Sequence, residues 1–304
     1  MTRRVSPRNL EIDSPGFPSN RFFSFRTESN GQTASLGGSV DLKLNGKSAL
    51  VTGSTAGIGF AIARALAREG SHVWVNGRTQ ARVDAAIASI KSEFPLATID
   101  GIAADFSSGE SAASAITARL PAVDILVNNV GIFDVKPFPE IPDSEWYRFF
   151  EINVMSGVRL SRHYLKPMLE KNWGRIIFIS SESAVQIPVE MVHYGMTKTA
   201  QVAIARGIAE SVAGSGVTVN SILAGPTASE GAGAFVESMA RQQSKTPQQI
   251  EKEFFEQARP TSLLKRFATT DEVAALVTYV AGEPSSATNG AALRVDGGVV
   301  RAIL

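Results

Sequence analysis

From Lys47 onward, the sequence alternates between short runs rich in β-branched and other apolar residues and longer stretches with the periodicity of amphipathic helices. Such alternation is typical of units in which parallel strands join one sheet and the connecting helices cover its two faces. We therefore expect an α/β fold built on a doubly wound, parallel, seven-stranded sheet. The expected strands are residues 48–52, 72–76, 98–103, 123–127, 175–180, 217–222 and 291–295.

The composition is that of a globular chain with a large apolar core. Hydrophobic residues make up 44% of the 304 residues and charged residues 19%, which is too little charge for a disordered polymer. The formal net charge is +1, so no general field attracts nucleic acid or anionic lipid. The lack of cysteine excludes disulfides, thiolate metal sites and cysteine nucleophiles. No apolar run approaches the roughly eighteen residues of a membrane span. From the net charge we therefore expect no nucleic-acid partner, and from the lack of such a run no membrane partner.

Residues 1–44 show no sustained period of two or 3.6 and are rich in Arg, Pro, Ser and Gly. We expect an N-terminal extension without its own core, either disordered or upstream of the true start, in which Phe22, Phe23 and Phe25 are candidates for docking on a neighbour. A transit peptide is less favoured because the segment contains acidic residues. Residues 45–304 are expected to form a single folded domain.

A glycine-rich turn joins the first expected strand to the helix after it, with the sequence Thr-Gly-Ser-Thr-Ala-Gly-Ile-Gly from Thr52 to Gly59. Glycine permits positive φ and a close approach of the backbone to an anion, and a helix N-terminus adds unpaired N–H groups. The alternative is that the glycines only allow tight packing of helix on strand. We expect the turn to bind a dinucleotide through Gly53, Ser54, Thr55, Gly57, Ile58 and Gly59.

The end of the second expected strand indicates which dinucleotide binds. An acidic residue there accepts a hydrogen bond from the ribose 2′-hydroxyl, whereas a basic residue suits a 2′-phosphate. The sequence is Val-Asn-Gly-Arg from Val75 to Arg78, without a carboxylate. Because Arg78 offers a charge-assisted, bidentate contact to phosphate, we expect NADP(H) to be preferred over NAD(H). A solvated arginine without a ligand is the alternative.

Tyr194 and Lys198 lie four residues apart in a stretch with helical periodicity, so both side chains project from one face. Ser181 ends an apolar run, at the carboxyl edge where open parallel sheets bind ligands. An ammonium beside a phenol stabilises the phenolate, and lowering its pKa by about three units needs roughly 4 kcal/mol. We therefore expect Lys198 to lower the pKa of Tyr194.

Taken together and in this order, the motifs resemble the short-chain dehydrogenase/reductase family, in its short single-domain branch of 3-oxoacyl-carrier-protein-reductase type. The resemblance covers about residues 44–298 and implies a Rossmann-like fold and a nicotinamide cofactor. It implies catalysis by Ser181, Tyr194, Lys198 and Asn153. It implies cofactor contacts from Asp105, Phe106, Asn128, Gly131, Tyr194 and Lys198. The motifs that carry it are the glycine-rich turn, Asn128-Asn129-Val130-Gly131, Asn153, Ser181, Tyr194-x-x-x-Lys198 and Val295-Asp296-Gly297-Gly298.

The implied reaction interconverts a ketone or 3-oxoacyl carbonyl and a secondary alcohol (EC 1.1.1.-). Hydride passes between cofactor and carbon while Tyr194 exchanges a proton with the oxygen. Ser181 would hydrogen-bond that oxygen, Lys198 would hold the nicotinamide ribose, and Asn153 would position a proton-conducting water. The alternative is an NAD(P)H-sensing regulatory protein without turnover. A Ser–His–Asp hydrolase and a metal enzyme are disfavoured, because the sequence has no Gly-x-Ser-x-Gly motif and no histidine pair with ligand spacing.

Three positions depart from the family pattern. Val130 replaces an alanine and should narrow the space beside the cofactor. The usual Pro-Gly order is reversed in Gly225-Pro226, which precedes Thr227, our candidate for contact with the nicotinamide carboxamide. Glu182 follows the serine directly; we expect it to face solvent, the alternative being a specificity residue for a polar or basic substrate.

Residues 229–267 resemble the family's substrate lid. The apolar residues Phe235, Met239, Phe254 and Phe255 within it fit core packing and a pocket wall equally well. Other apolar residues near the expected site favour a partly apolar ketone over a free sugar, and the substrate itself stays open. From the resemblance we also expect a cytoplasmic homotetramer or dimer, assembled through helices around residues 145–170 and 193–213.

Overall fold

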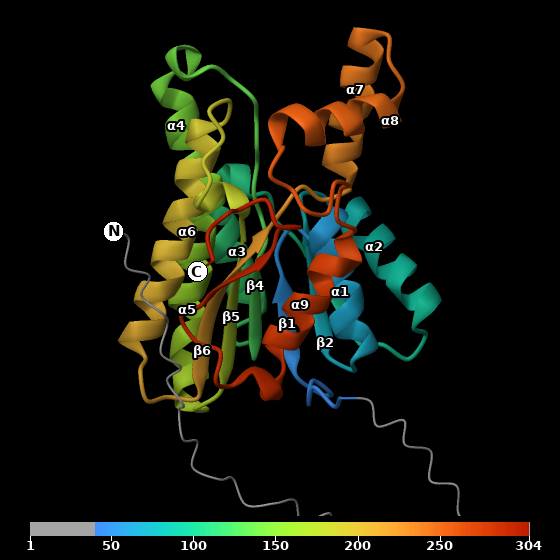
Figure 1. Cartoon of the computed structure of the whole chain (residues 1–304). Coiled ribbons are helices and arrows are strands. Elements are labelled where there is room, and N and C mark those ends of the chain that lie inside the picture. The colour runs from blue at the N-terminus through green and yellow to red at the C-terminus, as the bar shows by residue number, and fades with distance from the viewer. Residues whose placement is uncertain (1–39, 304) are drawn as a thin grey trace, which may run out of the picture. The chain divides into compact units, whose positions relative to one another are not determined.

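The described part of the chain contains one sheet of seven parallel strands in the order β3-β2-β1-β4-β5-β6-β7 (Figure 1). The chain builds one half outward from β1 to β3, returns to the centre and builds the other half from β4 to β7. Ligands bind such sheets where the order reverses, here beyond the carboxyl ends of β1 and β4. The strands are β1 (Ser48–Val51), β2 (His72–Gly77), β3 (Ile99–Ala103), β4 (Ile125–Asn128), β5 (Gly174–Ser181), β6 (Val217–Ala224) and β7 (Ala292–Val295).

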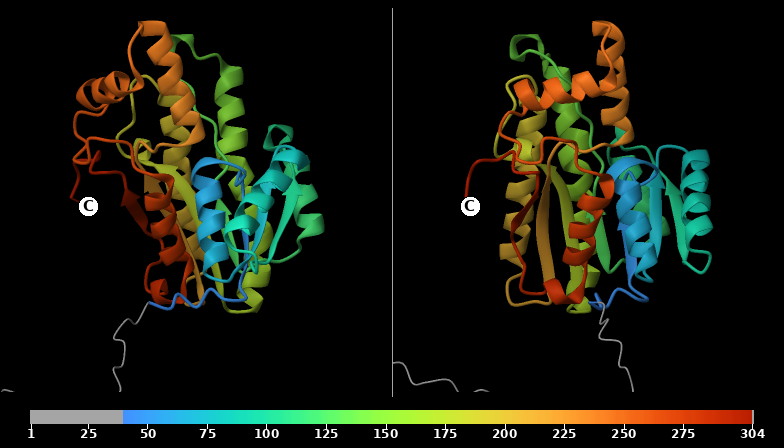
Figure 2. Two further views of the ribbon diagram at one scale, coloured as in Figure 1. Left: turned by 90° about the vertical axis from the view of Figure 1, so that its right-hand side faces the viewer. Right: turned by 45° about the vertical axis from the view of Figure 1, so that its right-hand side comes forward.

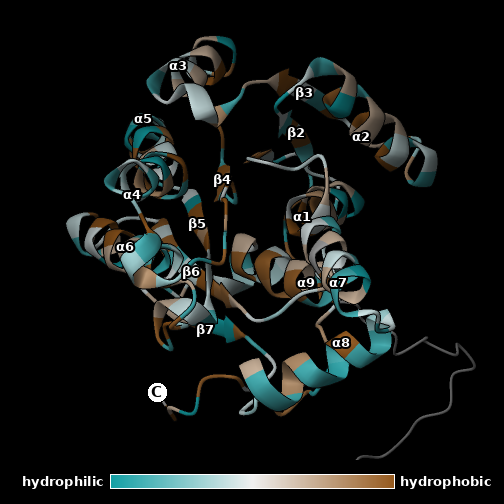
Figure 3. Cartoon of the chain, turned by 90° about the horizontal axis from the view of Figure 1, so that it is seen from above, coloured by the Kyte–Doolittle hydropathy of each residue, from teal (hydrophilic) through white to brown (hydrophobic). Residues whose placement is uncertain are grey.

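Helices cover both faces of the sheet (Figure 3). One face carries α1 (Gly57–Arg68), α2 (Gln80–Glu93) and α9 (Thr270–Ala281). The other carries α3 (Glu110–Arg119), α5 (Ser156–Glu170) and α6 (Val192–Ser211). The doubly wound, Rossmann-like fold expected from the sequence is confirmed, and each expected strand coincides with an observed one apart from its ends.

The apolar pattern explains this arrangement. Every residue of β5 and β6 is buried. This is expected for the central strands of a parallel sheet, because helices cover both of its faces. In α1, Ile62 and Leu66 are fully buried against the sheet, whereas Arg64 and Arg68 lie on the outer side. The core therefore consists of two apolar layers, one on each side of the sheet.

The computed structural model describes residues 40–303, except for the side chain of Phe235. The expectations for residues 1–39, among them Phe22, Phe23 and Phe25, fall outside the described residues. The compact unit starts at Asp41, and Leu44 is only 1% exposed. Residues 41–44, which we expected in the extension, thus belong to the folded unit.

The segment after β6 forms two helices beyond the carboxyl edge of the sheet, as both views in Figure 2 show. These are α7 (Glu230–Gln243) and α8 (Pro247–Glu253), and α8 continues into a π-helical turn, Phe254–Ala258. Ser229 caps α7 by accepting a hydrogen bond from the Ala232 N–H, and Thr246 forms a capping box with Gln249 at the start of α8. A further helix, α4 (Asp143–Phe150), joins α5 through a second π-helical turn, Glu151–Met155.

Candidate active site

A groove of about 440 Å³ lies beyond the carboxyl ends of β1, β2 and β4. This is the position where the sheet topology places a dinucleotide. Several residues that the sequence assigned to the cofactor line it, namely Gly53, Thr55, Arg78, Asp105, Phe106 and Gly131. The sequence interpretation did not include Ala56, Arg82, Asn129 and Arg148, which also line it.

The glycine-rich turn forms the floor of this groove. Gly53 has a φ of +61°, which a side chain would strain. A Cβ at Gly59 would lie 2.4 Å from both the Gly53 carbonyl oxygen and Asn129 Nδ2, so helix α1 approaches the turn as closely as its backbone permits. Asn129 Nδ2 donates to the carbonyl oxygens of Thr52 and Gly53. Asn129, which the sequence analysis names in a motif without giving it a role, therefore holds the backbone of this turn in place.

The remaining residues of the turn shape it from inside. Ser54 is fully buried; its hydroxyl donates to the Val51 carbonyl and accepts from the Asn76 N–H. Gly57, Ile58 and Gly59 belong to the first turn of α1 and do not line the groove. The helix N-terminus still directs its unpaired N–H groups toward this end of the sheet.

Three arginines, Arg78, Arg82 and Arg148, line the groove, and Arg82 forms an ion pair with Glu230 at the start of α7. No side chain of Glu or Asp stands at the end of β2 itself, where the described backbone runs through Asn76 and Gly77. Arg78, which directly follows β2, thus offers a guanidinium group where the ribose 2′-position of a dinucleotide is expected.

Asp105 and Asn128 occupy different environments. The Asp105 carboxylate lines the groove and accepts a hydrogen bond from the Ser107 N–H. Asn128 ends β4 as a buried residue whose amide donates to Ser161 Oγ, and it is not among the lining residues. Its neighbour Asn129 reaches the groove in its place. Val130 also lines the groove, and its Cγ2 packs against Gly53.

Ser181, Tyr194 and Lys198 come together because helix α6 packs along β5, with Ser181 at the strand's carboxyl end. Lys198 Nζ lies 5.5 Å from the centre of the Tyr194 ring. It donates to the Ile179 carbonyl oxygen at 2.9 Å and to Gln201 Oε1 at 3.2 Å. The spacing of Tyr194 and Lys198 in the sequence therefore predicts their contact correctly.

The protonation of this cluster differs from our expectation. Burial, and then the negative charge of Glu182, raise the pKa of Tyr194 above that of a free phenol. Burial lowers the pKa of Lys198 to about 8. The expected lowering of the Tyr194 pKa does not occur, because desolvation opposes both the phenolate and the ammonium and the Lys198 ammonium donates to two other oxygens.

Asn153 lies in the π-helical turn Glu151–Met155 and is buried. Its side chain accepts from the Ile132 N–H and donates to the Ile132 carbonyl and to Thr197 Oγ1. Gln201, which the sequence interpretation missed, bridges this residue to the cluster: its Nε2 donates to the Asn153 carbonyl at 2.6 Å. Gln201 lies three residues after Lys198, a spacing that places both on one helix face.

A second cavity, of about 420 Å³, lies above Ser181 and Tyr194 and beneath α7 and α8. Met239, Ile250 and Phe254 line it from the 229–267 segment, whereas Phe255 is buried beside it. The apolar residues of this segment thus serve both as pocket wall and as core. The cavity has two kinds of lining: apolar side chains on most sides and a polar group formed by Ser181, Glu182, Glu190, Tyr194 and Arg259.

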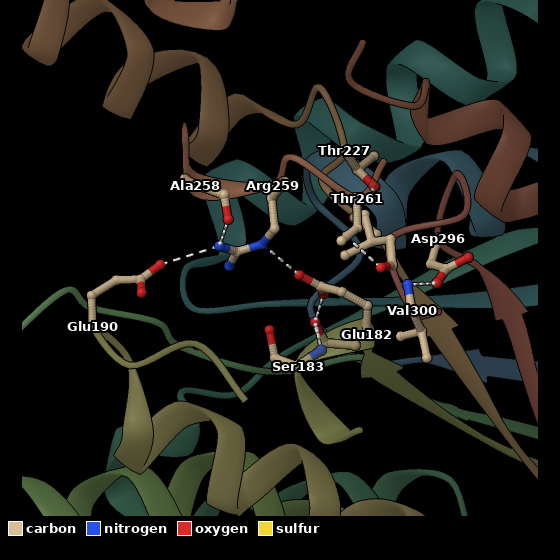
Figure 4. Close-up of polar contacts among 12 residues, drawn as sticks. Glu182, Ser183, Glu190, Thr227, Ala258, Arg259, Thr261, Asp296 and Val300 are labelled. Carbon is tan, nitrogen blue, oxygen red and sulfur yellow. Dashed lines mark hydrogen bonds and ion pairs between the residues drawn. The ribbon is translucent and has the colours of Figure 1, made fainter. Parts of the chain in front are cut away.

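Our expectation that Glu182 faces solvent is wrong. Glu182 is 4% exposed, and its Oε1 pairs with Arg259 Nε at 3.1 Å. Arg259 also contacts Glu190 Oε1 at 3.2 Å through Nη1 (Figure 4). Arg259 ends the π-helical turn after α8 and is 8% exposed. This partner from a distant segment compensates the buried carboxylate.

Thr227 also lines the second cavity, and its hydroxyl donates to the Gly225 carbonyl. The reversed Gly-Pro order has a steric cause. A Cβ at Gly225 would lie 2.6 Å from the Asp296 carbonyl oxygen, so the residue immediately after β6 has to be glycine. His193, which precedes Tyr194 on α6, is buried and packs against Phe149 with 4.1 Å between the ring centres.

Comparison with known proteins places the chain in a family. The family model for short chain dehydrogenases matches residues 47–240. The uncharacterized oxidoreductase YvaG of Bacillus subtilis is 47% identical over 264 residues, which cover 87% of this chain and 100% of that protein. The chain belongs to the short-chain dehydrogenase/reductase family. It is therefore an oxidoreductase that acts on CH–OH or carbonyl groups with a nicotinamide cofactor, as the resemblance implied.

Two further members of the family are similar over the whole folded unit. D-β-hydroxybutyrate dehydrogenase of Rhizobium meliloti is 32% identical, with 83% of this chain and 98% of that protein covered. The crystal structure of L-sorbose reductase from Gluconobacter frateurii, complexed with NADPH and L-sorbose, has a TM-score of 0.81 at 28% identity and covers 87% of this chain and 100% of that one.

Within residues 40–303, no helix has the length and apolar character needed to cross a membrane. No group of three or more His, Asp or Glu side chains in the same residues could hold a metal ion.

Proposed function

We propose that the protein is an NADP(H)-dependent oxidoreductase that interconverts a partly apolar ketone and its secondary alcohol, with Tyr194 as the acid and base. The observation that carries the proposal is the position of Tyr194 and Ser181, at the floor of the second cavity and beside the Lys198 ammonium. A carbonyl oxygen placed there meets a proton donor and a hydroxyl at once.

The groove at the switch point fits a dinucleotide, because Gly53 leaves part of its floor without a side chain and three arginines line it. A nicotinamide cofactor bound there supplies or accepts the hydride at the carbonyl carbon. We assign its pyrophosphate to the turn from Gly53 to Gly59 and its 2′-phosphate to Arg78. Asp105 and Phe106 contribute the adenosine side, Gly131 permits a close approach of the cofactor, and Thr227 binds the carboxamide.

The reaction requires a proton to move in step with the hydride. In reduction, the Tyr194 hydroxyl gives its proton to the substrate oxygen as negative charge develops on it, and in oxidation the phenolate takes the proton back. The Lys198 ammonium stabilises the phenolate, and Gln201 and Asn153 hold Lys198 in place. The raised pKa of Tyr194 keeps the phenol protonated, so that it can donate its proton to the substrate oxygen.

The second cavity supports a substrate with an apolar body. Phe133, Met191 and Phe254 are among its lining residues, with the polar group confined to the end that holds Tyr194. We propose that residues 229–267 act as the lid over this substrate. L-sorbose, the ligand of L-sorbose reductase, is more polar than the apolar side chains that line this cavity. A substrate panel should therefore include both apolar ketones and sugars.

The direct test is steady-state oxidation of NADPH and NADH with a panel of ketones, 3-oxoacyl thioesters and keto sugars. Turnover with an apolar ketone and NADPH would support the proposal. Tight NADPH binding without turnover of any carbonyl compound would instead favour a sensor of the cofactor's redox state.

Replacing Arg78 with alanine should raise the Kd for NADPH by about 10- to 100-fold and leave the Kd for NADH nearly unchanged, because one charge-assisted contact to the 2′-phosphate is lost. Isothermal titration with both cofactors measures the change. Arg68→Ala, which removes an exposed arginine at the far end of α1, is the matched control. An unchanged NADPH preference in the Arg78 variant would contradict this assignment.

The pH dependence of reduction should report the titration of Lys198. Its pKa of about 8 means that the ammonium is present below this pH and is lost as the pH rises through it. We expect kcat/KM for ketone reduction to fall above about pH 8. Lys198→Arg, whose guanidinium stays charged, should lack this alkaline limb, whereas Lys171→Arg at the exposed ion pair with Asp124 should retain it. A limb that persists in Lys198→Arg would assign it to another group.

We further propose that the protein assembles as a dimer or tetramer through α4, α5 and α6. Tyr147 and Phe150 on α4 and Leu169 on α5 are large apolar residues with substantial exposure, which is typical of surfaces covered by a partner. Sedimentation equilibrium measures the mass, and a monomer would refute the assembly.

A further inference from the structure

Gln201 is a buried polar residue of α6 whose side-chain amide is bonded at both ends. It is 1% exposed. Its Nε2 donates to the Asn153 carbonyl oxygen at 2.6 Å, and its Oε1 accepts from Lys198 Nζ at 3.2 Å. Because a main-chain carbonyl only accepts hydrogen bonds and an ammonium only donates them, the amide can lie in this one direction only. Gln201 therefore presents an acceptor to Lys198.

The π-helical turn Glu151–Met155 fixes where this acceptor lies. Asn153 in the turn donates from its side chain to Thr197 Oγ1 at 3.0 Å and accepts from Gln201 with its carbonyl oxygen. The turn thus contacts α6 both before and after Lys198 in the chain. Gln201 follows Lys198 by three residues, so both side chains lie on one face of this helix.

The Lys198 ammonium has three N–H donors, and two of them are bound by the protein. One donates to the Ile179 carbonyl oxygen at 2.9 Å and another to Gln201. Nζ lies close to the groove at the switch point, because a Cβ at Gly131, one of the residues that line this groove, would be 3.5 Å from it. The third N–H remains for Tyr194 or for a ligand in the groove.

We propose that Gln201 is a positioning residue that holds the Lys198 ammonium beside Tyr194 through an uncharged acceptor. The inference rests on the proposed function, in which the ammonium stabilises the Tyr194 phenolate. A carboxylate at position 201 would bind the ammonium more strongly, but its negative charge would oppose the phenolate. The amide of Gln201 stabilises the ammonium without cancelling its positive charge.

The other groups around Lys198 do not replace this contact. Burial lowers the pKa of Lys198 to about 8, and the negative charge of Glu182, at the end of β5, acts against this shift. Tyr194 lies on the same helix, and Arg259 of the lid acts on Tyr194. Within residues 40–303, Gln201 is the only side chain that accepts a hydrogen bond from this ammonium. The other elements beside Lys198 contribute the uncharged residues Ile179, Gly131 and Asn153.

Gln201→Leu tests the inference by removing the acceptor at nearly constant volume. The buried ammonium then loses one hydrogen bond, so the pKa of Lys198 should fall by about one unit. Because the ammonium is lost as the pH rises through this pKa, the alkaline limb of kcat/KM for ketone reduction should move from about pH 8 to about pH 7. At pH 8, kcat/KM should be about fivefold below the wild type, and at pH 6 within about threefold of it.

Gln201→Glu should move the same limb in the opposite direction. The carboxylate has the shape of the amide but places a negative charge beside the ammonium, which raises the pKa of Lys198 by at least about one unit. The limb should therefore lie at about pH 9 or above. Turnover at pH 7 should fall, because the carboxylate offsets the positive charge that stabilises the phenolate. A role of Gln201 in packing alone would lower kcat/KM at every pH and leave the limb in place in both variants.

The matched controls are Gln242→Leu and Gln242→Glu. Gln242 is an exposed residue of α7 that lines neither the groove nor the second cavity. The same two substitutions there should leave the alkaline limb at about pH 8.

A second readout needs neither substrate nor cofactor. In a chain labelled with [13C]lysine, the Cε resonance of Lys198 shifts when the ammonium loses its proton, and the resonance is identified by its disappearance in Lys198→Arg. The midpoint should lie near pH 8 in the wild type. It should be about one pH unit lower in Gln201→Leu and at least about one unit higher in Gln201→Glu.

The outcomes separate the two proposals. Midpoints that stay in place in both Gln201 variants, or that move in the same direction in both, would overturn the role of Gln201. Opposite shifts in a chain that turns over no carbonyl compound would overturn the proposed function and leave the contact of Gln201 with the ammonium standing. If Gln201→Leu does not fold, Gln201→Met replaces it, because methionine fills irregular space and its sulfur is only a weak acceptor. The same acid shift is then expected, and its absence would contradict the inference.

Discussion

Phenylalanine in place of Tyr194 should lower kcat/KM by roughly 10³-fold in both directions, because a positioned general acid contributes about 10² to 10⁴. The substitution removes one oxygen from a ring that is held by its position on α6, so the fold has no reason to change. Cofactor binding should stay within about threefold of the wild type, since the groove that we assign to the dinucleotide is lined by other residues.

Tyr147→Phe is the matched control for this experiment. Tyr147 lies on α4, is 74% exposed and lines neither cavity, so its hydroxyl should contribute nothing to turnover. Steady-state kinetics on both variants, with fluorescence titration of NADPH, measure the difference. Normal turnover in Tyr194→Phe would reject the proton-transfer mechanism, and a parallel loss of NADPH binding would instead indicate a structural role.

Adding one methyl group at Gly59 should lower the free energy of unfolding by about 1–3 kcal/mol, the usual cost of overpacking. The new Cβ would lie 2.4 Å from the Gly53 carbonyl oxygen, and a backbone atom moves away less easily than a flexible side chain. Because the same displacement distorts the turn, the Kd for NADPH should rise by at least about tenfold.

Gly207→Ala is the opposite case in the same protein. Gly207 lies within α6, and a Cβ there would meet nothing within 4 Å. Alanine is favoured over glycine inside a helix by about 1 kcal/mol, so this variant should be more stable than the wild type. Denaturant unfolding of both variants decides the matter: equal effects of the two substitutions would show that the contact at Gly59 is not a constraint.

The sequence predicts those features that depend on local spacing. The alternation of runs fixes the sheet, and the four-residue interval between Tyr194 and Lys198 places both on one face of α6. The choice between Asn128 and Asn129 at the groove is less predictable. It depends on where β4 ends and on which face each side chain takes beyond that point, and the structure places Asn129 there.

Features that depend on distant partners could not be predicted from one sequence. Glu182 next to Ser181 reads as a surface charge until Arg259, which is 77 residues away, is seen to pair with it. The prediction that Lys198 lowers the pKa of Tyr194 was wrong for the same reason. Proximity to Lys198 can be inferred from spacing, but the degree of desolvation is a property of the packed structure.

The π-helical turn Glu151–Met155 holds one residue more than a regular helix would need to make the passage from α4 to α5. Each residue turns a helix by about 100° about its axis. Deleting one residue from this turn would therefore rotate α4 by about that angle relative to α5. The side-chain amide of Asn153 donates to the Ile132 carbonyl and to Thr197 Oγ1. Its orientation depends on the π-helical turn in which Asn153 lies. A homologous chain that is shorter by one residue at this point would therefore have to orient its asparagine by other means.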